Sequence, residues 1–192
     1  MNVTRSTRIS KYLARHLRHD PQRIGITLDA RGWVPVEELL RAAAQHGFRF
    51  SRAELAEVVA DNDKQRYSLD TSQDRIRANQ GHSVPVELDL AATRPPDWLY
   101  HGTSARSVAA IQKEGLRPMN RHAVHLSPRR ETARRVGTRR GRPVVLPVAA
   151  ADMHRDGHVF QVSVNGVWLV SAVPPRYLSF PDTLTPPVPP RR

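Results

Sequence analysis

Cysteine is absent from this chain of 192 residues. Disulfides, thiolate metal sites and a cysteine nucleophile are therefore excluded. The sequence also has no apolar run near the roughly 20 residues that a membrane-spanning helix needs, no apolar N-terminal segment typical of a signal peptide, and no motif with metal-ligand spacing. We therefore expect a cytoplasmic protein that uses no metal and has no membrane partner.

Lysine is scarce as well: only Lys11, Lys64 and Lys113 occur, although Lys and Arg together number 30 against 18 Asp and Glu. Arginine therefore carries almost all of the net charge of +12. Genome base composition is one explanation for this preference. The charge excess nevertheless favours a polyanionic partner such as nucleic acid, and arginine is well suited to two-pronged contacts with phosphate.

Two apolar segments end in histidine followed by small or hydroxyl residues, at 99–104 and 122–127. The helical spacing over 108–114 predicts a helix between two strands. His101 and His125 would then occupy corresponding strand positions. The residues after the first histidine, Gly-Thr-Ser, would form a turn whose backbone N–H groups approach an anionic ligand. An ordinary strand-turn-helix with two satisfied core histidines fits the same spacing.

The N-terminal half predicts three helices and a hairpin, in segments 10–17, 35–46, 51–60, 67–69 and 76–78. The first helix should stop before Pro21, which disfavours helical geometry in the residue preceding it. Pro35 is suited to open the second helix, and Ser51 with Glu54 forms a capping box for the third. Three helices followed by a hairpin are typical of a winged helix, a fold that serves many functions.

The C-terminal half predicts three further strands and one helix, in segments 144–148, 159–162, 167–170 and 128–136. Asn165-Gly166 is a hairpin turn signal between the last two strands. Ser127 is expected to cap the helix, with Pro128 at its first position.

The predicted fold class is α+β, with a winged-helix lobe followed by a mostly β lobe. Three prolines without hydrophobic periodicity mark the boundary between the lobes. The expected organisation is an N-terminal lobe at 1–83, a linker at 84–96, a C-terminal lobe at 97–180 and a disordered, proline-rich tail at 181–192. We expect the chain to be a monomer.

Several segments resemble signatures of the NAD-dependent RNA 2′-phosphotransferases, and the similarity covers roughly residues 8–180. The C-terminal lobe is similar to the NAD-binding half of ADP-ribosyltransferases. The matching segments are Leu17-Arg18-His19, Asp63-Lys64-Gln65-Arg66-Tyr67, Arg75-Ile76-Arg77-Ala78-Asn79-Gln80-Gly81-His82-Ser83, His101-Gly102-Thr103, His122-Ala123-Val124-His125-Leu126-Ser127 and Gly137-Thr138-Arg139.

The resemblance implies a two-step removal of a 2′-phosphate from RNA, with NAD as co-substrate. The RNA 2′-phosphate attacks the NAD ribose and expels nicotinamide, which gives an ADP-ribosylated 2′-phospho-RNA intermediate. The ribose O2″ then attacks the phosphorus and releases 2′-OH RNA and ADP-ribose 1″,2″-cyclic phosphate. The active site is expected between the two lobes.

The resemblance also implies four catalytic residues. Arg18, Arg66 and Arg139 would hold the RNA phosphate, with Arg140 competing for the role of Arg139. His19 would position the same phosphate or move a proton at the ribose O2″. Without the resemblance, Arg18 and His19 are equally interpretable as cations at a helix C-terminus.

The NAD-binding residues implied by the resemblance are His101, Gly102, Thr103, His125 and Ser127. His101, Thr103 and Ser127 would hold the ribose and pyrophosphate of NAD. His125 would lie along the nicotinamide side. Nine arginines between residues 117 and 142 would add contacts to RNA phosphates, although a solvated basic face needs no such role.

Two alternatives remain open from the sequence. One is an ADP-ribosyltransferase that modifies terminal phosphates of nucleic acid and stops after the first step. The other is a winged-helix protein that binds nucleic acid without catalysis. An ADP-ribosyltransferase acting on proteins is disfavoured, because no acidic residue stands near Val159 and Phe160, where relatives of that kind often carry a catalytic glutamate.

Overall fold

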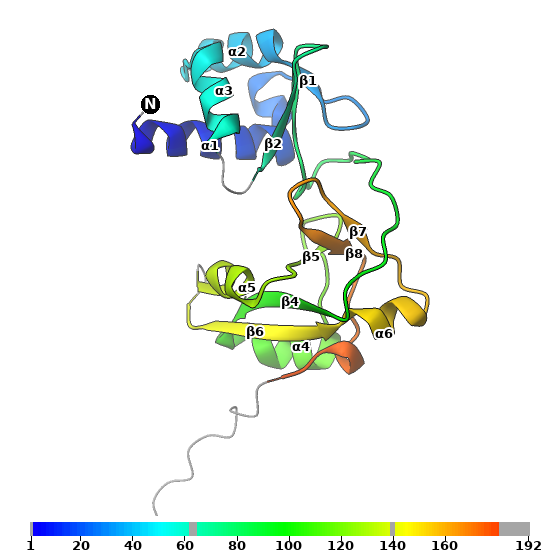
Figure 1. Ribbon diagram of the computed structural model, residues 1–192. Helices are drawn as coiled ribbons and strands as arrows, with labels where there is room; N and C mark the ends of the chain where they lie inside the picture. The colour runs from blue at the N-terminus through cyan, green and yellow to red at the C-terminus, as the bar shows by residue number, and fades with distance from the viewer. Residues whose placement is uncertain (1, 62–64, 139–140, 181–192) are drawn as a thin grey trace, which may run out of the picture. The chain divides into compact units, whose positions relative to one another are not determined.

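The computed structural model describes residues 2–61, 65–138 and 141–180, which form two compact units (Figure 1). Unit 1 comprises Met1–Ala91, Met119–His122 and Val162–Asn165, and unit 2 comprises the remaining segments. Two short segments that the sequence analysis places in the C-terminal lobe thus belong to unit 1. The expected disordered tail at 181–192 lies outside the described residues.

Unit 1 holds three α-helices and a small antiparallel sheet in the strand order β1-β3-β2. The first helix has Asn2 as its N-cap and begins at Val3, seven residues before the segment at 10–17 that apolar spacing predicts, because its early turns are polar. The elements are α1 (Val3–Arg18), η1 (Pro21–Ile24), β1 (Val34–Pro35), α2 (Val36–Gln45), α3 (Arg52–Ala60), β2 (Tyr67–Asp70) and β3 (Arg75–Ala78).

One side of α1 forms the centre of the hydrophobic core of unit 1. Ile9, Leu13 and Leu17 are fully buried at the helical spacing of four residues. They pack in one cluster with Leu39 of α2 and Ile76 of β3. The burial of this apolar stripe fixes the opposite, basic side of α1 toward solvent, and it fixes where the C-terminal end of the helix lies.

Unit 2 is built from a two-stranded sheet, β4-β6, and a three-stranded sheet, β5-β8-β7. Helix α5 packs against β4 and β6 on one side of the first sheet, and α4 lies on its other side (Figure 1). The elements are β4 (Trp98–Ser104), η2 (Ala105–Ser107), α4 (Val108–Glu114), β5 (Val124–Leu126), α5 (Arg130–Gly137), β6 (Pro143–Ala149), α6 (Ala150–Arg155), β7 (Gln161–Val162), β8 (Trp168–Val170) and η4 (Pro175–Tyr177).

The predicted polar turn at 102–104 is wrong, because β4 continues to Ser104. Gly102 pairs with Val145 and Thr103 pairs with Val144 in an unbroken antiparallel ladder. The expected approach of a ligand to turn N–H groups is thus replaced by strand pairing with β6.

The predicted start of the helix after Ser127 is also wrong, by two residues. The backbone N–H and carbonyl of Ser127 both pair with Tyr100, which keeps the serine extended beside β4. Its hydroxyl accepts the N–H of Arg129 (3.1 Å) in a local turn, and α5 begins at Arg130. Within the described residues, no helix has the length and apolar character needed to cross a membrane.

Candidate active site

The C-terminal end of α1 presents Arg18 and His19, as the sequence analysis predicts for this helix. His19 is the C-cap, and its N–H donates to the carbonyl of Arg15. The backbone N–H of Ser83 donates to the carbonyl of Arg18 (2.8 Å), and the Ser83 hydroxyl lies 3.0 Å from Nδ1 of His19. The Gln-Gly-His-Ser segment therefore caps α1 and orients both residues.

The side chain of Arg18 lies against Gly81 and Tyr67. Gly81 has a φ of +89°, and a Cβ built there would lie 3.6 Å from Nη1 of Arg18. The guanidinium carbon of Arg18 is 5.8 Å from the centre of the Tyr67 ring. One amino group donates weakly to the carbonyl of Arg66 (3.4 Å). These contacts hold the guanidinium in place without neutralising its charge.

Among the described residues, the ionisable groups that act on Arg18 include no carboxylate, and its Nε is buried without a hydrogen-bond acceptor. Burial lowers the pKa of Arg18, Tyr67 raises it, and the nearby charges of Arg66 and Arg121 lower it further. The pKa of His19 is lowered by burial and by Arg18 and Arg121. Several cations close together, one of them with a guanidinium nitrogen that lacks an acceptor, make an environment suited to an anion.

Arg121 is a member of this cluster that the sequence analysis missed. Among the nine arginines between residues 117 and 142, nothing in the spacing distinguishes it. Its place follows from the tertiary structure, because the segment Met119–His122 belongs to unit 1 although its neighbours on both sides belong to unit 2.

His82 is a buried neighbour of the same cluster, with 3% of its surface exposed. Neither ring nitrogen has a hydrogen-bond partner among the described residues. Burial lowers the pKa of His82 to about 4, and Arg18, His122, His19 and Arg77 contribute in the same direction. The ring is therefore neutral at pH 7 and adds no charge to the site.

In unit 2, adjacent strands bring His101 and His125 together, as the sequence analysis predicts. Nδ1 of His101 donates to the carbonyl of His125 (3.2 Å), and Nδ1 of His125 donates to the carbonyl of Ala123 (3.0 Å). Because a carbonyl oxygen only accepts, both contacts place a proton on Nδ1 of each ring. Ser127 joins this group, because its backbone pairs with Tyr100, the neighbour of His101.

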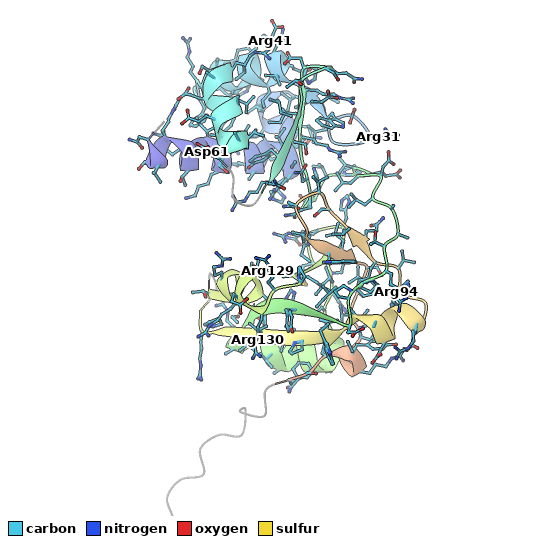
Figure 2. The ribbon with its side chains drawn as sticks, viewed as in Figure 1. Arg31, Arg41, Asp61, Arg94, Arg129 and Arg130 are labelled. Carbon is cyan, nitrogen blue, oxygen red and sulfur yellow. The ribbon has the colours of Figure 1, made fainter. Side chains whose placement is uncertain are left out.

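Gly102 has a packing role that the sequence analysis did not foresee. A Cβ at this position would lie 1.7 Å from the carbonyl oxygen of Ala133, and one at Gly137 would lie 2.6 Å from that of Thr103. The two glycines thus let α5 approach β4 closely. At the start of this helix, Arg129 and Arg130 are exposed (Figure 2).

The structure therefore gathers two separate sets of predicted site residues. Arg18, His19 and Arg66 belong to unit 1, and the histidine pair with its neighbours Gly102, Thr103 and Ser127 belongs to unit 2. The proposed catalytic Arg139 and its competitor Arg140 lie outside the described residues.

The class of protein is thus an α+β protein in which a half-buried arginine stands among other cations, an arrangement suited to a phosphorylated ligand. Comparison with known proteins gives the particular family: residues 4–172 match the RNA 2′-phosphotransferase, Tpt1 / KptA family. The chain belongs to this family of transferases.

Its relatives include proteins named "Probable RNA 2′-phosphotransferase" from three bacteria. The Streptomyces griseus protein is 64% identical over 185 residues, which cover 93% of this chain and 98% of that protein. The Streptomyces coelicolor protein is 63% identical, and the match covers 94% of this chain and 98% of that protein. The Burkholderia pseudomallei protein is 56% identical, and the match covers 92% of this chain and 96% of that protein.

Proposed function

We propose that this protein removes an internal 2′-phosphate from RNA by transferring it to NAD. The products are 2′-OH RNA, ADP-ribose 1″,2″-cyclic phosphate and nicotinamide. Family membership supports the phosphate removal. The observation that carries the assignment of the phosphate site is Arg18, a half-buried arginine with cationic neighbours whose buried Nε has no acceptor in the described part of the chain.

Three arginines suit the charge that this chemistry concentrates on one phosphorus. A guanidinium stays charged at every physiological pH and can bind two phosphate oxygens at once. Arg18, Arg66 and Arg121 would hold the 2′-phosphate and stabilise the extra negative charge that develops on its oxygens during transfer. Arg139, which the family resemblance implies, would serve the same phosphate.

His19 is suited to hold a proton near this phosphate. Burial and two neighbouring cations lower its pKa, so the ring is neutral at pH 7 in the absence of an anion. A bound phosphate would raise the pKa again, because an opposite charge favours the protonated ring. We assign His19 to phosphate positioning and to proton movement at the ribose O2″.

Unit 2 contains a set of groups that fits a ribose and a pyrophosphate. His101, Thr103 and Ser127 offer ring nitrogens and hydroxyls from adjacent strands, and His125 would lie along the nicotinamide. The arginines at the start of α5 suit the pyrophosphate charge. When bound, NAD supplies a ribose carbon that loses nicotinamide with oxocarbenium character and is captured by a phosphate oxygen.

The same reasoning leads us to propose the finer architecture. Unit 1 has the element order of a winged helix: helix, strand, two helices and a hairpin, with β1 completing the sheet. Unit 2 is proposed to be an ADP-ribosyltransferase-like fold, with its two small sheets and the histidine pair on β4 and β5.

A direct test uses a short RNA with one internal 2′-phosphate, incubated with the protein with and without NAD, in the absence of divalent cations. We expect the phosphate to leave only with NAD and to appear in ADP-ribose 1″,2″-cyclic phosphate. Release of nicotinamide with ADP-ribose retained on RNA would instead identify a transferase that stops after the first step. Binding of RNA without any change in RNA or NAD would identify a non-catalytic protein.

A further inference from the structure

A second cationic site lies along α1, in a pocket of about 500 Å³ within unit 1. Four cations line it: Arg8, Lys11 and Arg15 from α1, and Arg23 from η1. No aspartate or glutamate is among its lining residues. Arg15 forms an ion pair with Asp20 (3.5 Å) between half-exposed side chains, which offsets one of the four charges.

Aromatic side chains form part of the same pocket. The rings of Tyr12 and Phe48 are stacked, with centroids 4.3 Å apart and planes inclined by 14°. The guanidinium carbon of Arg8 lies 5.9 Å from the centre of the Phe48 ring. Both aromatic residues are half-buried, so they are held by the core and still line the pocket. Cations beside aromatic rings are the groups that bind single-stranded nucleic acid, through phosphates and stacked bases.

The helical spacing connects this pocket with the phosphate site. Arg8, Lys11, Arg15 and Arg18 follow one another at intervals of three or four residues, which places them along one side of α1. The opposite side of the helix is the buried apolar stripe. A polyanion bound in the pocket would thus extend along α1 toward the guanidinium of Arg18.

We propose that this pocket, the α1 pocket, binds the single-stranded RNA that flanks the 2′-phosphorylated nucleotide. The proposal rests on the proposed function for its substrate, and it adds a contact outside the reacting groups. The favoured occupant is a nucleic-acid strand, because the pocket combines uncompensated positive charge with stacked aromatic rings. The α1 pocket would then increase the affinity for longer RNA and leave the reaction of a dinucleotide unchanged.

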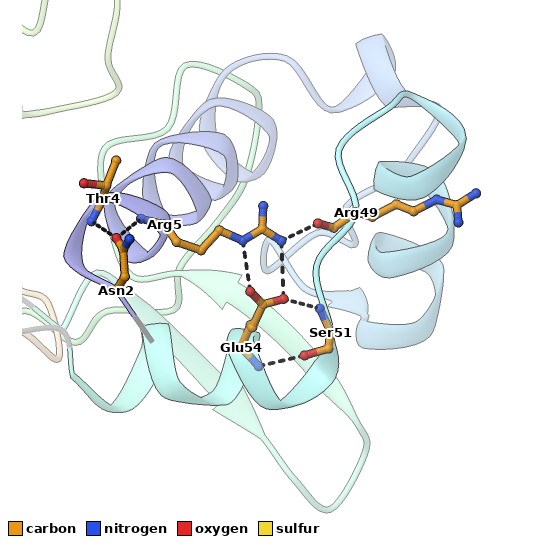
Figure 3. Close-up of polar contacts among 6 residues, drawn as sticks. All are labelled: Asn2, Thr4, Arg5, Arg49, Ser51 and Glu54. Carbon is orange, nitrogen blue, oxygen red and sulfur yellow. Dashed lines mark hydrogen bonds and ion pairs between the residues drawn. The ribbon is translucent and has the colours of Figure 1, made fainter.

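The test compares a dinucleotide carrying one internal 2′-phosphate with a single-stranded RNA of about 12 nucleotides carrying the same group. The variant is Arg8→Gln/Lys11→Gln, which removes two exposed charges of the α1 pocket. The matched control is Arg41→Gln/Arg49→Gln, which removes the same charge from exposed residues of unit 1 outside the pocket lining (Figures 2 and 3).

We expect the α1-pocket variant to bind the longer RNA about tenfold more weakly than the wild type, with kcat unchanged. The slope of log affinity against log salt should fall by about 1.4, since each lost phosphate contact on a single strand contributes ~0.7. For the dinucleotide, kcat/KM should equal that of the wild type. The control should match the wild type in every measurement.

Equal affinities of the α1-pocket variant and the control for the longer RNA would overturn the proposal. The proposal would also be overturned if the α1-pocket variant lost as much kcat/KM on the dinucleotide as on the longer RNA. That result would place these residues in the reaction itself. A wild type that binds RNA through the α1 pocket but leaves the 2′-phosphate in place would refute the proposed function, while the pocket assignment would stand.

Discussion

Arg18 is a cation whose surroundings lower its pKa and whose Nε has no acceptor in the described part of the chain. Such a side chain is costly to bury, because its lost hydration is not replaced by a carboxylate. The proposed phosphate site accounts for this cost. Binding of a phosphate there would replace the lost hydration and remove the repulsion among Arg18, Arg66 and Arg121.

Replacement of this residue should separate stability from activity. In Arg18→Met, an apolar chain of similar length removes the unpaired charge, so we expect the free energy of unfolding to stay the same or rise by up to about 1 kcal/mol. The rate of 2′-phosphate removal should fall by about 100-fold or more, as for other lost transition-state contacts. Urea denaturation and single-turnover assays measure the two effects.

The control for this prediction is Leu17→Ala, one residue earlier in α1. Leu17 is fully buried in the core of unit 1, so its truncation should lower the free energy of unfolding by about 2–5 kcal/mol. A loss of similar size in Arg18→Met would show that Arg18 is a structural residue rather than part of an anion site.

His82 predicts a pH dependence of stability with a definite sign. Its pKa is about 4 in the folded protein, whereas an unfolded histidine titrates near 6.5. Between these values the unfolded chain binds a proton that the folded protein does not. Stability is therefore complete above pH 6.5 and decreases as the pH falls toward 4, by about 3 kcal/mol in all.

Denaturation curves at pH 7 and pH 4.5 test this for the wild type and His82→Gln, which cannot titrate. The difference in unfolding free energy between the two pH values should be smaller in the variant, by about 2–3 kcal/mol. Equal pH dependence of the two proteins would mean that His82 keeps an ordinary pKa in the folded state.

At the scale of the elements, α3 is fixed by a capping box that also contacts α1 (Figure 3). The Ser51 hydroxyl accepts the N–H of Glu54 (3.1 Å), and the Glu54 carboxylate accepts the N–H of Ser51 (2.9 Å). The same carboxylate accepts a hydrogen bond from Nε of Arg5 (2.9 Å). The bond from Arg5 lowers the pKa of Glu54 to about 2, so the carboxylate keeps these contacts at any pH above 4.5.

We expect Ser51→Ala to lower the free energy of unfolding by about 1 kcal/mol, the usual effect of losing an N-cap hydroxyl. Ser51→Gly should lower the free energy of unfolding by only a few tenths of a kcal/mol, because glycine exposes the helix N–H groups to water. Thermal and urea denaturation measure both. Full stability in Ser51→Ala would show that the hydroxyl contributes nothing.

The close approach of α5 to β4 predicts a strong effect of a single methyl group. In Gly102→Ala the new Cβ would overlap the Ala133 carbonyl, a backbone atom that cannot rotate away. We expect a loss of about 3 kcal/mol or more in the stability of unit 2. Gly157→Ala is a comparison without overlap: a Cβ at Gly157 meets no atom within 4 Å, so the cost there comes from its left-handed backbone (φ +92°) and should stay smaller.

Element boundaries were predictable where local chemistry decides them. The end of α1 before Pro21 and the capping box at Ser51 follow from residues next to one another in sequence, and α2 starts one residue after the predicted Pro35, which is its N-cap. The turn at 102–104 was mispredicted because Gly102 serves a contact with α5, and that contact depends on tertiary packing. Helix α6 was not predicted, since its six residues are too few to show a clear period.

For the whole molecule, the sequence identifies the two lobes by composition but cannot assign every segment to its unit. Residues 119–122 and 162–165 pack in unit 1, whereas the chain on either side of them belongs to unit 2. Arg121 was missed as a site residue for this reason, since its role depends on tertiary packing. The motifs that name Arg18, His19 and the histidine pair were readable because each is a short local pattern.

The net charge of +12 predicts that RNA affinity as a whole depends on salt. If four phosphates are contacted, raising the salt from 50 to 200 mM should weaken binding about 50-fold, since each contact contributes ~0.7 to the slope. The preference for 2′-phosphorylated over unmodified RNA should change much less. That preference depends on the buried guanidinium of Arg18, and salt screens partly buried charges less than exposed ones.

Titrations of a fluorescent RNA with and without the 2′-phosphate, in the absence of NAD, measure both quantities at each salt concentration. In Arg18→Met, the affinity for unmodified RNA should change little while the preference for the phosphorylated strand is lost. A preference that falls in parallel with total affinity would mean that the 2′-phosphate is held only by the exposed charges of the surface. Persistence of the preference at high salt would place its recognition at the buried arginine at the end of α1.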